Sequence, residues 1–84
     1  MKLIFSEQAW EDYLYWQKTN RKLLQRINAL INEIAREPFS GTGKPESLKH
    51  ALSGYWSRRI NEEHRIVYKV SDGDLLIAQL RYHY

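Results

Sequence analysis

The sequence predicts an α+β protein in which two N-terminal helices cover one face of a twisted antiparallel sheet. In residues 7–37, apolar side chains recur at three- and four-residue intervals, which is typical of helices with one buried side. From residue 53 onward, residue types alternate with a period of two between turn signals, which is typical of strands with one buried face. The 84 residues suffice for one domain, so we expect residues 1–84 to form a single unit.

A short strand over residues 2–5 is expected to precede the first helix. Ser6 is a good N-cap because its hydroxyl can accept a hydrogen bond from a free N–H group of the first turn, and Glu7 suits the positive helix end. One stripe of this helix should face the core. It consists of Trp10, Tyr13, Leu14 and Gln17, widened by Trp16.

The second helix gives the strongest periodic signal. Asn20 is its candidate N-cap. Pro38 ends it, because the residue before a proline is disfavoured in the helical conformation. The apolar stripe consists of Leu23, Leu24, Ile27, Leu30, Ile31 and Ile34.

Residues 38–47 hold Pro and Gly and are predicted to form a loop. Its GTGK stretch at residues 41–44 lacks the spacing of a P-loop, and no strand precedes it, so nucleotide binding is rejected. Residues 48–52 are expected to start the sheet. Turns follow at residues 53–54, at residues 61–63 and at Asp72-Gly73, which is a strong hairpin signal.

Successive side chains of a strand point to opposite faces, so parity sorts the strand residues into two sets. One set is mainly apolar and contains Trp56, Arg58, Ile60, Ile66, Tyr68, Val70, Leu76, Ala78, Leu80 and Tyr82. The other set carries the cations Arg59, Arg65, Arg81 and His83. A sheet that buries the first set leaves a cationic face suited to a polyanion.

Composition limits the classes of function. Thirteen Lys and Arg against ten Asp and Glu give a net charge of +3, which only weakly favours nucleic acid. The absence of cysteine excludes a disulfide framework and thiolate ligands, and no apolar run approaches the ~20 residues of a membrane span, so a cytoplasmic location is expected. His50, His64 and His83 lack the spacing of a zinc pair, so we expect no metal site.

Glu46, Arg65 and His83 could together cleave RNA. Attack by the RNA's own 2′-hydroxyl needs a base, a cation that stabilises the charge on phosphorus, and an acid for the leaving 5′-oxygen. A carboxylate, a guanidinium and an imidazole supply these roles without a metal. Each residue type is common in small proteins, however, so a solvated loop charge, a surface strand residue and a tail residue remain alternative interpretations.

The motifs GKPE, LSGYWSRRI, EEHR and RYHY support the catalytic interpretation. With them the chain resembles, from end to end, the YoeB toxins of bacterial toxin–antitoxin systems, within the RelE-like group. The resemblance implies the RelE-like microbial RNase fold and a ribosome-dependent mRNA endonuclease that acts in the A site, inhibits translation and needs no cofactor. It also implies a homodimer and a YefM-like antitoxin, and DNA would be bound only through the antitoxin complex.

The resemblance also assigns roles to residues. It implies that Glu46 is the general base, Arg65 the phosphate-stabilising arginine and His83 the general acid. Tyr84 would orient or stack the substrate. Lys49 and Arg59 would hold the RNA backbone, and we add Arg81 to these RNA-binding residues.

Two alternatives belong to other classes of protein. A non-catalytic RelE-fold interaction module that poisons another target, such as gyrase, would not need Glu46, Arg65, His83 and Tyr84 together. A DNA-binding repressor would need a recognition element, and no helix-turn-helix signature is present in the sequence.

Overall fold

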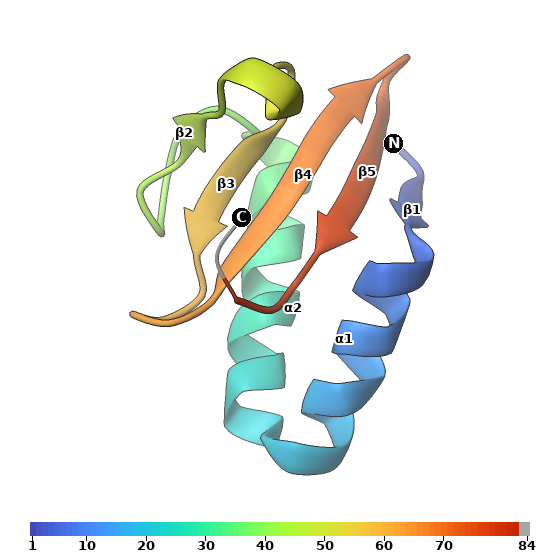
Figure 1. Ribbon diagram of the computed structural model, residues 1–84, viewed down its shortest axis with the longest axis vertical. Helices are drawn as coiled ribbons and strands as arrows, with labels where there is room; N and C mark the ends of the chain where they lie inside the picture. The colour runs from blue at the N-terminus through green and yellow to red at the C-terminus, as the bar shows by residue number, and fades with distance from the viewer. Residues whose placement is uncertain (83–84) are drawn as a thin grey trace.

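Two helices lie against a five-stranded sheet in the computed structural model, which describes residues 1–82 (Figure 1). The helices are α1 (Glu7–Thr19) and α2 (Arg21–Arg36), and a 3₁₀ turn, η1, spans His50–Leu52. The strands are β1 (Leu3–Phe5), β2 (Glu46–Ser47), β3 (Trp56–Arg59), β4 (Arg65–Ser71) and β5 (Asp74–Gln79), in the spatial order β1-β5-β4-β3-β2. The predicted α+β class is confirmed. The sheet is mixed, because β1 pairs with β5 in parallel while the other neighbouring strands are antiparallel.

Local signals placed the helix boundaries correctly. The Ser6 hydroxyl accepts from the N–H of Ala9 at 3.0 Å, and the Asn20 side chain accepts from the N–H of Leu23 at 3.0 Å, so both predicted N-caps are confirmed. The second helix stops two residues before Pro38. Within residues 1–82, no helix is both long and apolar enough to cross a membrane.

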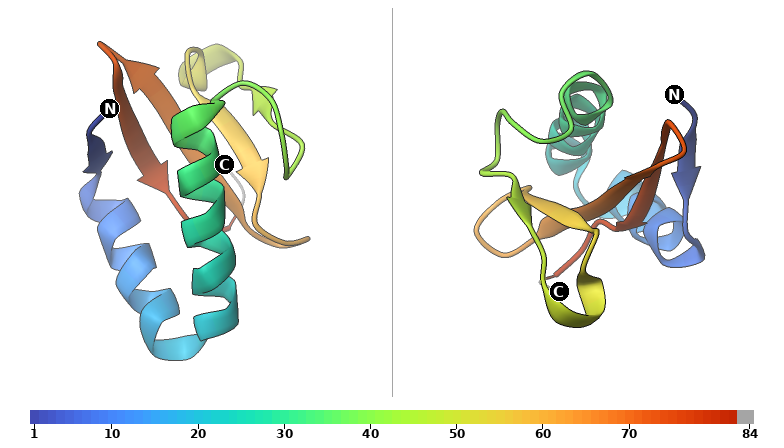
Figure 2. Two further views of the ribbon diagram at one scale, coloured as in Figure 1. Left: turned by 180° about the vertical axis from the view of Figure 1, so that it is seen from behind. Right: turned by 90° about the horizontal axis from the view of Figure 1, so that it is seen from above.

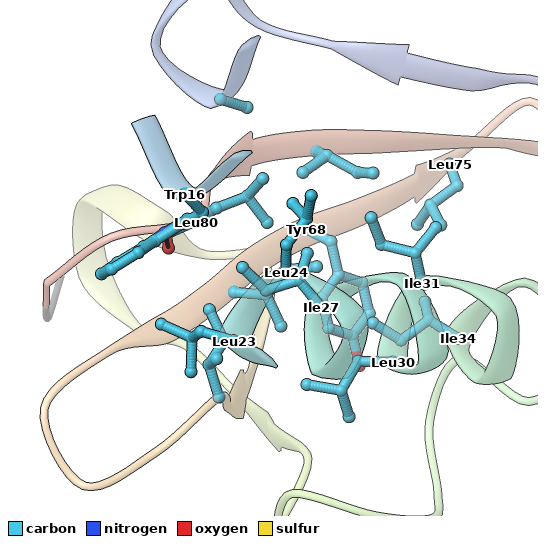
Figure 3. Packing of buried hydrophobic residues seen from close by; sticks show 14 residues of the cluster. Trp16, Leu23, Leu24, Ile27, Leu30, Ile31, Ile34, Tyr68, Leu75 and Leu80 are labelled. Atoms are coloured by element: carbon cyan, nitrogen blue, oxygen red, sulfur yellow. Dashed lines mark hydrogen bonds between the residues drawn. The ribbon is translucent and has the colours of Figure 1, made fainter. Parts of the chain in front are cut away.

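The core lies between α2 and the sheet (Figures 2 and 3). All six residues of the predicted α2 stripe are buried, and each such aliphatic side chain contributes about 1.5–3 kcal/mol relative to an exposed one. Figure 3 shows the labelled α2 side chains in one cluster with Tyr68 of β4 and Leu75 of β5. The sheet side of the core consists of Ile60, Ile66, Tyr68, Leu75, Ile77 and Leu80.

The predicted stripe of α1 was wrong in part. Trp16 is buried, but Trp10 is 50% exposed and Leu14 is 40% exposed. The helix instead buries Ala9 and the carboxylate of Asp12, which a search for apolar periodicity does not find. The carboxylate is buried because it accepts hydrogen bonds there, as described below.

The predicted start of the sheet was also wrong. Residues 48–52 do not form a strand: after α2 the sheet resumes at β2, and η1 follows. His50 has a positive φ of 59°, which interrupts any extended segment at that point. The N–H of Leu48 donates to the Tyr55 carbonyl at 2.9 Å and closes the connection between β2 and β3.

The predicted faces of β5 were wrong because the strand contains a β-bulge. Tyr68 pairs with Ile77 but Val67 pairs with Gln79, so Ala78 is an extra residue opposite β4. Parity reverses at such a residue. The buried side chains are therefore Leu75, Ile77 and Leu80, rather than Leu76, Ala78 and Leu80 as expected.

The predicted turns are confirmed. Asp72 and Gly73 connect β4 directly to β5, and both have the positive φ that this type of two-residue hairpin requires. In the turn between β3 and β4, the Asn61 side chain accepts from the N–H groups of Glu63 and His64 at 2.9 and 2.8 Å. Gly54, in the turn before β3, also has a positive φ.

Arg58 connects the loop after α2 to the sheet. Parity placed it on the helix-facing side, and its side chain is fully buried there. The guanidinium donates to the carbonyl oxygens of Glu37, Ser40 and Thr42, the last two at 2.7 and 3.3 Å. The Glu33 carboxylate lies 3.4 Å from it. Hydrogen bonds and an opposite charge together compensate the cost of burying a cation.

Tyr68 and Glu33 extend this network. The Tyr68 hydroxyl donates to the Pro38 carbonyl at 2.6 Å and accepts from Nε of Arg58 at 3.2 Å, and burial raises the pKa of Tyr68. The Thr42 N–H donates to the Glu33 carboxylate at 2.7 Å, and this bond lowers the pKa of Glu33. The loop is thus held by both α2 and the sheet.

Replacing Arg58 by Met should lower the free energy of unfolding by about 3–5 kcal/mol, since three carbonyl groups lose a donor and the Glu33 carboxylate loses its opposite charge. Urea unfolding measures the loss. Arg21→Met, at the exposed start of α2, is the control and should stay within about 0.5 kcal/mol of wild type. A loss below about 1 kcal/mol for Arg58→Met would show that the network adds little stability.

Glu33→Gln should lower stability at neutral pH but not at acid pH. The pKa of Glu33 is lowered in the folded state, so the ionised carboxylate stabilises the fold above the unfolded-state value near 4.5. This stabilisation is lost as the pH falls through the folded-state pKa, where Glu33 becomes neutral like Gln. Thermal melts between pH 3 and pH 7 should therefore converge at the acid end. A constant offset at every pH would contradict the linkage.

Candidate functional site

The face of the sheet opposite the helices carries a polar cluster. In the strand register, Glu46 of β2 lies opposite Ser57 of β3, and Ser57 lies opposite Val67 of β4. Arg65 precedes Val67 by two residues and therefore shares its face. Strand pairing alone thus brings Glu46, Ser57 and Arg65 to one region.

Arg65 is held at the centre of this cluster. Its Nε donates to the Ser57 hydroxyl at 3.0 Å, and its Nη2 donates to Oε1 of Glu46 at 3.3 Å. The Arg65 side chain is 10% exposed and Ser57 is fully buried, whereas the Glu46 side chain is 54% exposed. A fixed guanidinium therefore lies beside a carboxylate that solvent, or a ligand, can reach.

Two further cations lie near this pair, one through strand pairing and one through its place in the sequence. Arg59 of β3 is directly opposite Arg65 in the register and is exposed. Like charges opposite one another destabilise a sheet, but they favour a bound anion. Lys49 is exposed at the start of η1, three residues beyond Glu46.

Arg81 does not lie beside the other arginines as expected. Its guanidinium carbon lies 3.5 Å from the ring centre of Tyr15 on α1 and 4.8 Å from that of Tyr82. The strand ends at Gln79, and Tyr82 has a positive φ of 61°, so strand parity no longer applies there. The predicted cationic face thus contains Arg59 and Arg65, and RNA binding by Arg81 stays a prediction.

The proposed acid and substrate-orienting residue, His83 and Tyr84, lie outside the described residues. The chain before them reaches the cluster, because the Arg65 N–H donates to the Tyr82 carbonyl at 3.1 Å. The last described residue thus lies beside the strand that carries the site arginine.

Sequence reasoning missed the parts played by Ser57 and His64. Ser57 orients Arg65 through its hydroxyl, and Nδ1 of His64 accepts from the Tyr82 N–H at 2.7 Å. Strand parity could have placed Ser57, but the contact of His64 depends on the path of the chain after β5. Among residues 1–82, no three His, Cys, Asp or Glu side chains are grouped to hold a metal ion.

The pair of Glu46 and Arg65 suits proton abstraction beside an anionic centre. A carboxylate can take a proton from a hydroxyl, and an adjacent guanidinium can stabilise negative charge that develops on a phosphate. The Ser57 hydroxyl limits movement of the guanidinium, so the donor needs little reorganisation.

The whole chain is similar to known toxins. A family model described as a YoeB-like toxin of bacterial type II toxin-antitoxin system matches residues 5–84. Toxin YoeB of Escherichia coli (strain K12) is 63% identical over 84 residues, with 100% of both chains covered. Toxin YoeB of Synechocystis sp. (strain PCC 6803) is 62% identical, with 100% of this chain and 98% of the relative covered.

Solved structures are similar over the same length. A YoeB/ParE toxin from Agrobacterium tumefaciens is 50% identical, with a TM-score of 0.97 and full coverage of both chains. A YoeB-YefM complex from Staphylococcus aureus contains a chain that is 50% identical, with a TM-score of 0.92 and coverage of 100% and 98%. YafQ from E. coli, at 19% identity and a TM-score of 0.81, shares the fold.

Replacing Arg59 by Thr should raise the free energy of unfolding by about 0.2–1 kcal/mol at low salt, because it removes the like charge opposite Arg65. Salt screens exposed charges, so the gain should shrink as NaCl is added during urea unfolding. Arg59→Lys is the matched control, since it keeps the charge and should show little gain. A loss of stability at every salt concentration would mean that the two arginines do not repel each other in the fold.

Proposed function

Because the chain belongs to the family of YoeB-like toxins of bacterial type II toxin–antitoxin systems, we propose that it is a ribosome-dependent endoribonuclease that cleaves mRNA in the ribosomal A site and so inhibits translation. The observation that carries the proposal is the contact of 3.3 Å between Nη2 of Arg65 and Oε1 of Glu46 on the face of the sheet opposite the helices. This contact supports the assignment of Glu46 as a base and Arg65 as a phosphate-stabilising cation that act on the same scissile bond.

Each residue has one role in the proposed reaction. Glu46 takes the proton of the 2′-hydroxyl, whose oxygen attacks phosphorus, and Arg65 stabilises the charge that gathers on the phosphate oxygens. His83 gives a proton to the leaving 5′-oxygen, and Tyr84 orients or stacks the substrate. The 2′-oxygen–phosphorus bond forms as the 5′-oxygen–phosphorus bond breaks, which leaves a 2′,3′-cyclic phosphate. No cofactor or metal takes part.

The exposure of the two side chains agrees with these roles. A base must meet its substrate, and the Glu46 side chain is half exposed. A stabilising cation benefits from a fixed position, and Arg65 is nearly buried and bonded to Ser57. Preorganised donors of this kind need no rearrangement as charge develops.

The ribosome supplies most of the binding energy in this proposal. A net charge of +3 gives little general affinity for RNA, whose binding depends on many phosphate contacts. Lys49, Arg59 and Arg81 would hold the backbone once the ribosome presents the bent mRNA, and the orientation of the reacting groups would then provide much of the rate enhancement.

Two partners are part of the proposal. The structural relatives include a YoeB-YefM complex and a YoeB dimer, both from Staphylococcus aureus. By extension, we expect this protein to form a homodimer and to be neutralised in the cytoplasm by a YefM-like antitoxin. An acidic antitoxin segment that folds on binding would suit the exposed Arg59. DNA would be bound only through the antitoxin complex.

Primer extension on a defined mRNA in a reconstituted translation reaction tests the activity. Wild type should cut at A-site positions only when ribosomes are present. Glu46→Gln and His83→Ala should reduce cutting by about 10²–10⁴-fold, because each removes a proton-transfer group. Glu62→Gln, in the exposed turn before β4, is the matched control and should cut like wild type.

Other outcomes would reject the proposal in different ways. Equal cutting of naked RNA would make the protein a ribosome-independent ribonuclease. No cutting by folded wild type would favour the non-catalytic interaction module that poisons another target, such as gyrase.

A further inference from the structure

The chain after β5 is held by two side chains of α1. The N–H of Leu80 donates to Oδ2 of Asp12 at 2.9 Å, and the Leu80 carbonyl accepts from the indole N–H of Trp16 at 2.9 Å. Asp12 is 2% exposed, and its other carboxylate oxygen accepts from Gln8 at 2.8 Å. Because both backbone polar groups of Leu80 are hydrogen-bonded to side chains of α1, Leu80 has a well-defined position.

Tyr82 is held by His64, in the turn between β3 and β4, and by Arg65, the first residue of β4. Its N–H donates to Nδ1 of His64 at 2.7 Å, and its carbonyl accepts from the N–H of Arg65 at 3.1 Å. With a φ of 61°, Tyr82 has a left-handed conformation that residues other than glycine adopt infrequently. These hydrogen bonds compensate the cost of that conformation.

His64 is itself fixed. Its N–H donates to the Asn61 side chain at 2.8 Å, its carbonyl accepts from the N–H of Ile60 at 2.9 Å, and its ring packs edge-on against Trp16 at 4.8 Å between ring centres. The residue is 7% exposed. Because Nδ1 accepts a hydrogen bond, the neutral ring carries its proton on Nε2. His64 therefore contributes an acceptor as well as volume.

We propose that His64 is a positioning residue for cleavage: by accepting from the Tyr82 N–H, it fixes beside Arg65 the point from which the chain continues to His83. The inference rests on the proposed function. His64 is buried and acts through Tyr82 rather than on the RNA. A displacement of Tyr82 is passed on to the residue that follows it, and misplacing a reacting group by about 1 Å can cost about 10²-fold in rate.

Two substitutions separate the acceptor from the packing of the ring. His64→Asn places an amide oxygen near the position of Nδ1 but fills less space, whereas His64→Phe keeps the ring against Trp16 and has no acceptor. In single-turnover cleavage on programmed ribosomes, His64→Phe should lower the maximal rate by about 10- to 100-fold with little change in the half-saturating concentration. His64→Asn should recover most of the rate, although packing alone would favour Phe.

Ile31→Val, a mild change in the α2 stripe, is the control for lost stability, and it should keep the wild-type rate. Thermal melts establish that each variant is folded. Full activity of folded His64→Phe would overturn the proposal. Equal loss in folded His64→Asn and His64→Phe would also overturn it, since that result would assign the effect to packing.

A measurement on the wild type keeps this test separate from that of the proposed function. Nuclear magnetic resonance should detect a scalar coupling across the hydrogen bond from the Tyr82 amide to Nδ1 of His64, together with slow exchange of that amide. Absence of both overturns the positioning role whatever the variants do. Wild type that cleaves nothing, with the coupling present, would instead reject the nuclease and with it the catalytic consequence of the contact.

Discussion

The burial of Arg58 is the constraint on which much of this architecture depends. A guanidinium enclosed between α2 and the sheet must be given acceptors, and the loop after α2 supplies them as carbonyl groups. This fixes the loop that leads into β2, and in β2 Glu46 lies opposite Ser57. The residues on either side of Arg58 in β3 point to the opposite face, so one short strand organises the scaffold with Arg58 and the candidate site with Ser57 and Arg59.

The candidate site depends on residues that hold its members in place from behind. Ser57 holds Arg65, and α1 holds the chain after β5 through Asp12 and Trp16. The first contact fixes the guanidinium that lies beside the exposed carboxylate of Glu46, and the other two fix the backbone that leads to Tyr82. Exposed cations such as Arg59 add positive charge, and we expect a cost in stability because Arg59 lies opposite Arg65.

Sequence reasoning succeeded where a local signal determines the structure. Periodicity, caps and turn chemistry placed the α2 stripe, both N-caps and the hairpin after β4. It failed where distant contacts decide: the bulge at Ala78 reversed the faces of β5, and the buried carboxylate of Asp12 changed the buried side of α1. In the site, strand parity and family resemblance brought Glu46, Arg59 and Arg65 together. The contacts of Ser57, His64 and Arg81 depend on a chain path that no local pattern encodes.

The pairing of β1 with β5 has a consequence for synthesis of the protein. The strand made first is completed by the strand made last, and the Leu75 N–H donates to the Lys2 carbonyl at 2.8 Å. A chain emerging from the ribosome therefore cannot close its sheet, or cover the apolar side of α2, until residues 74–79 are outside the exit tunnel. An incomplete chain that lacks β5 therefore also lacks the finished sheet on which Glu46 and Arg65 are brought together.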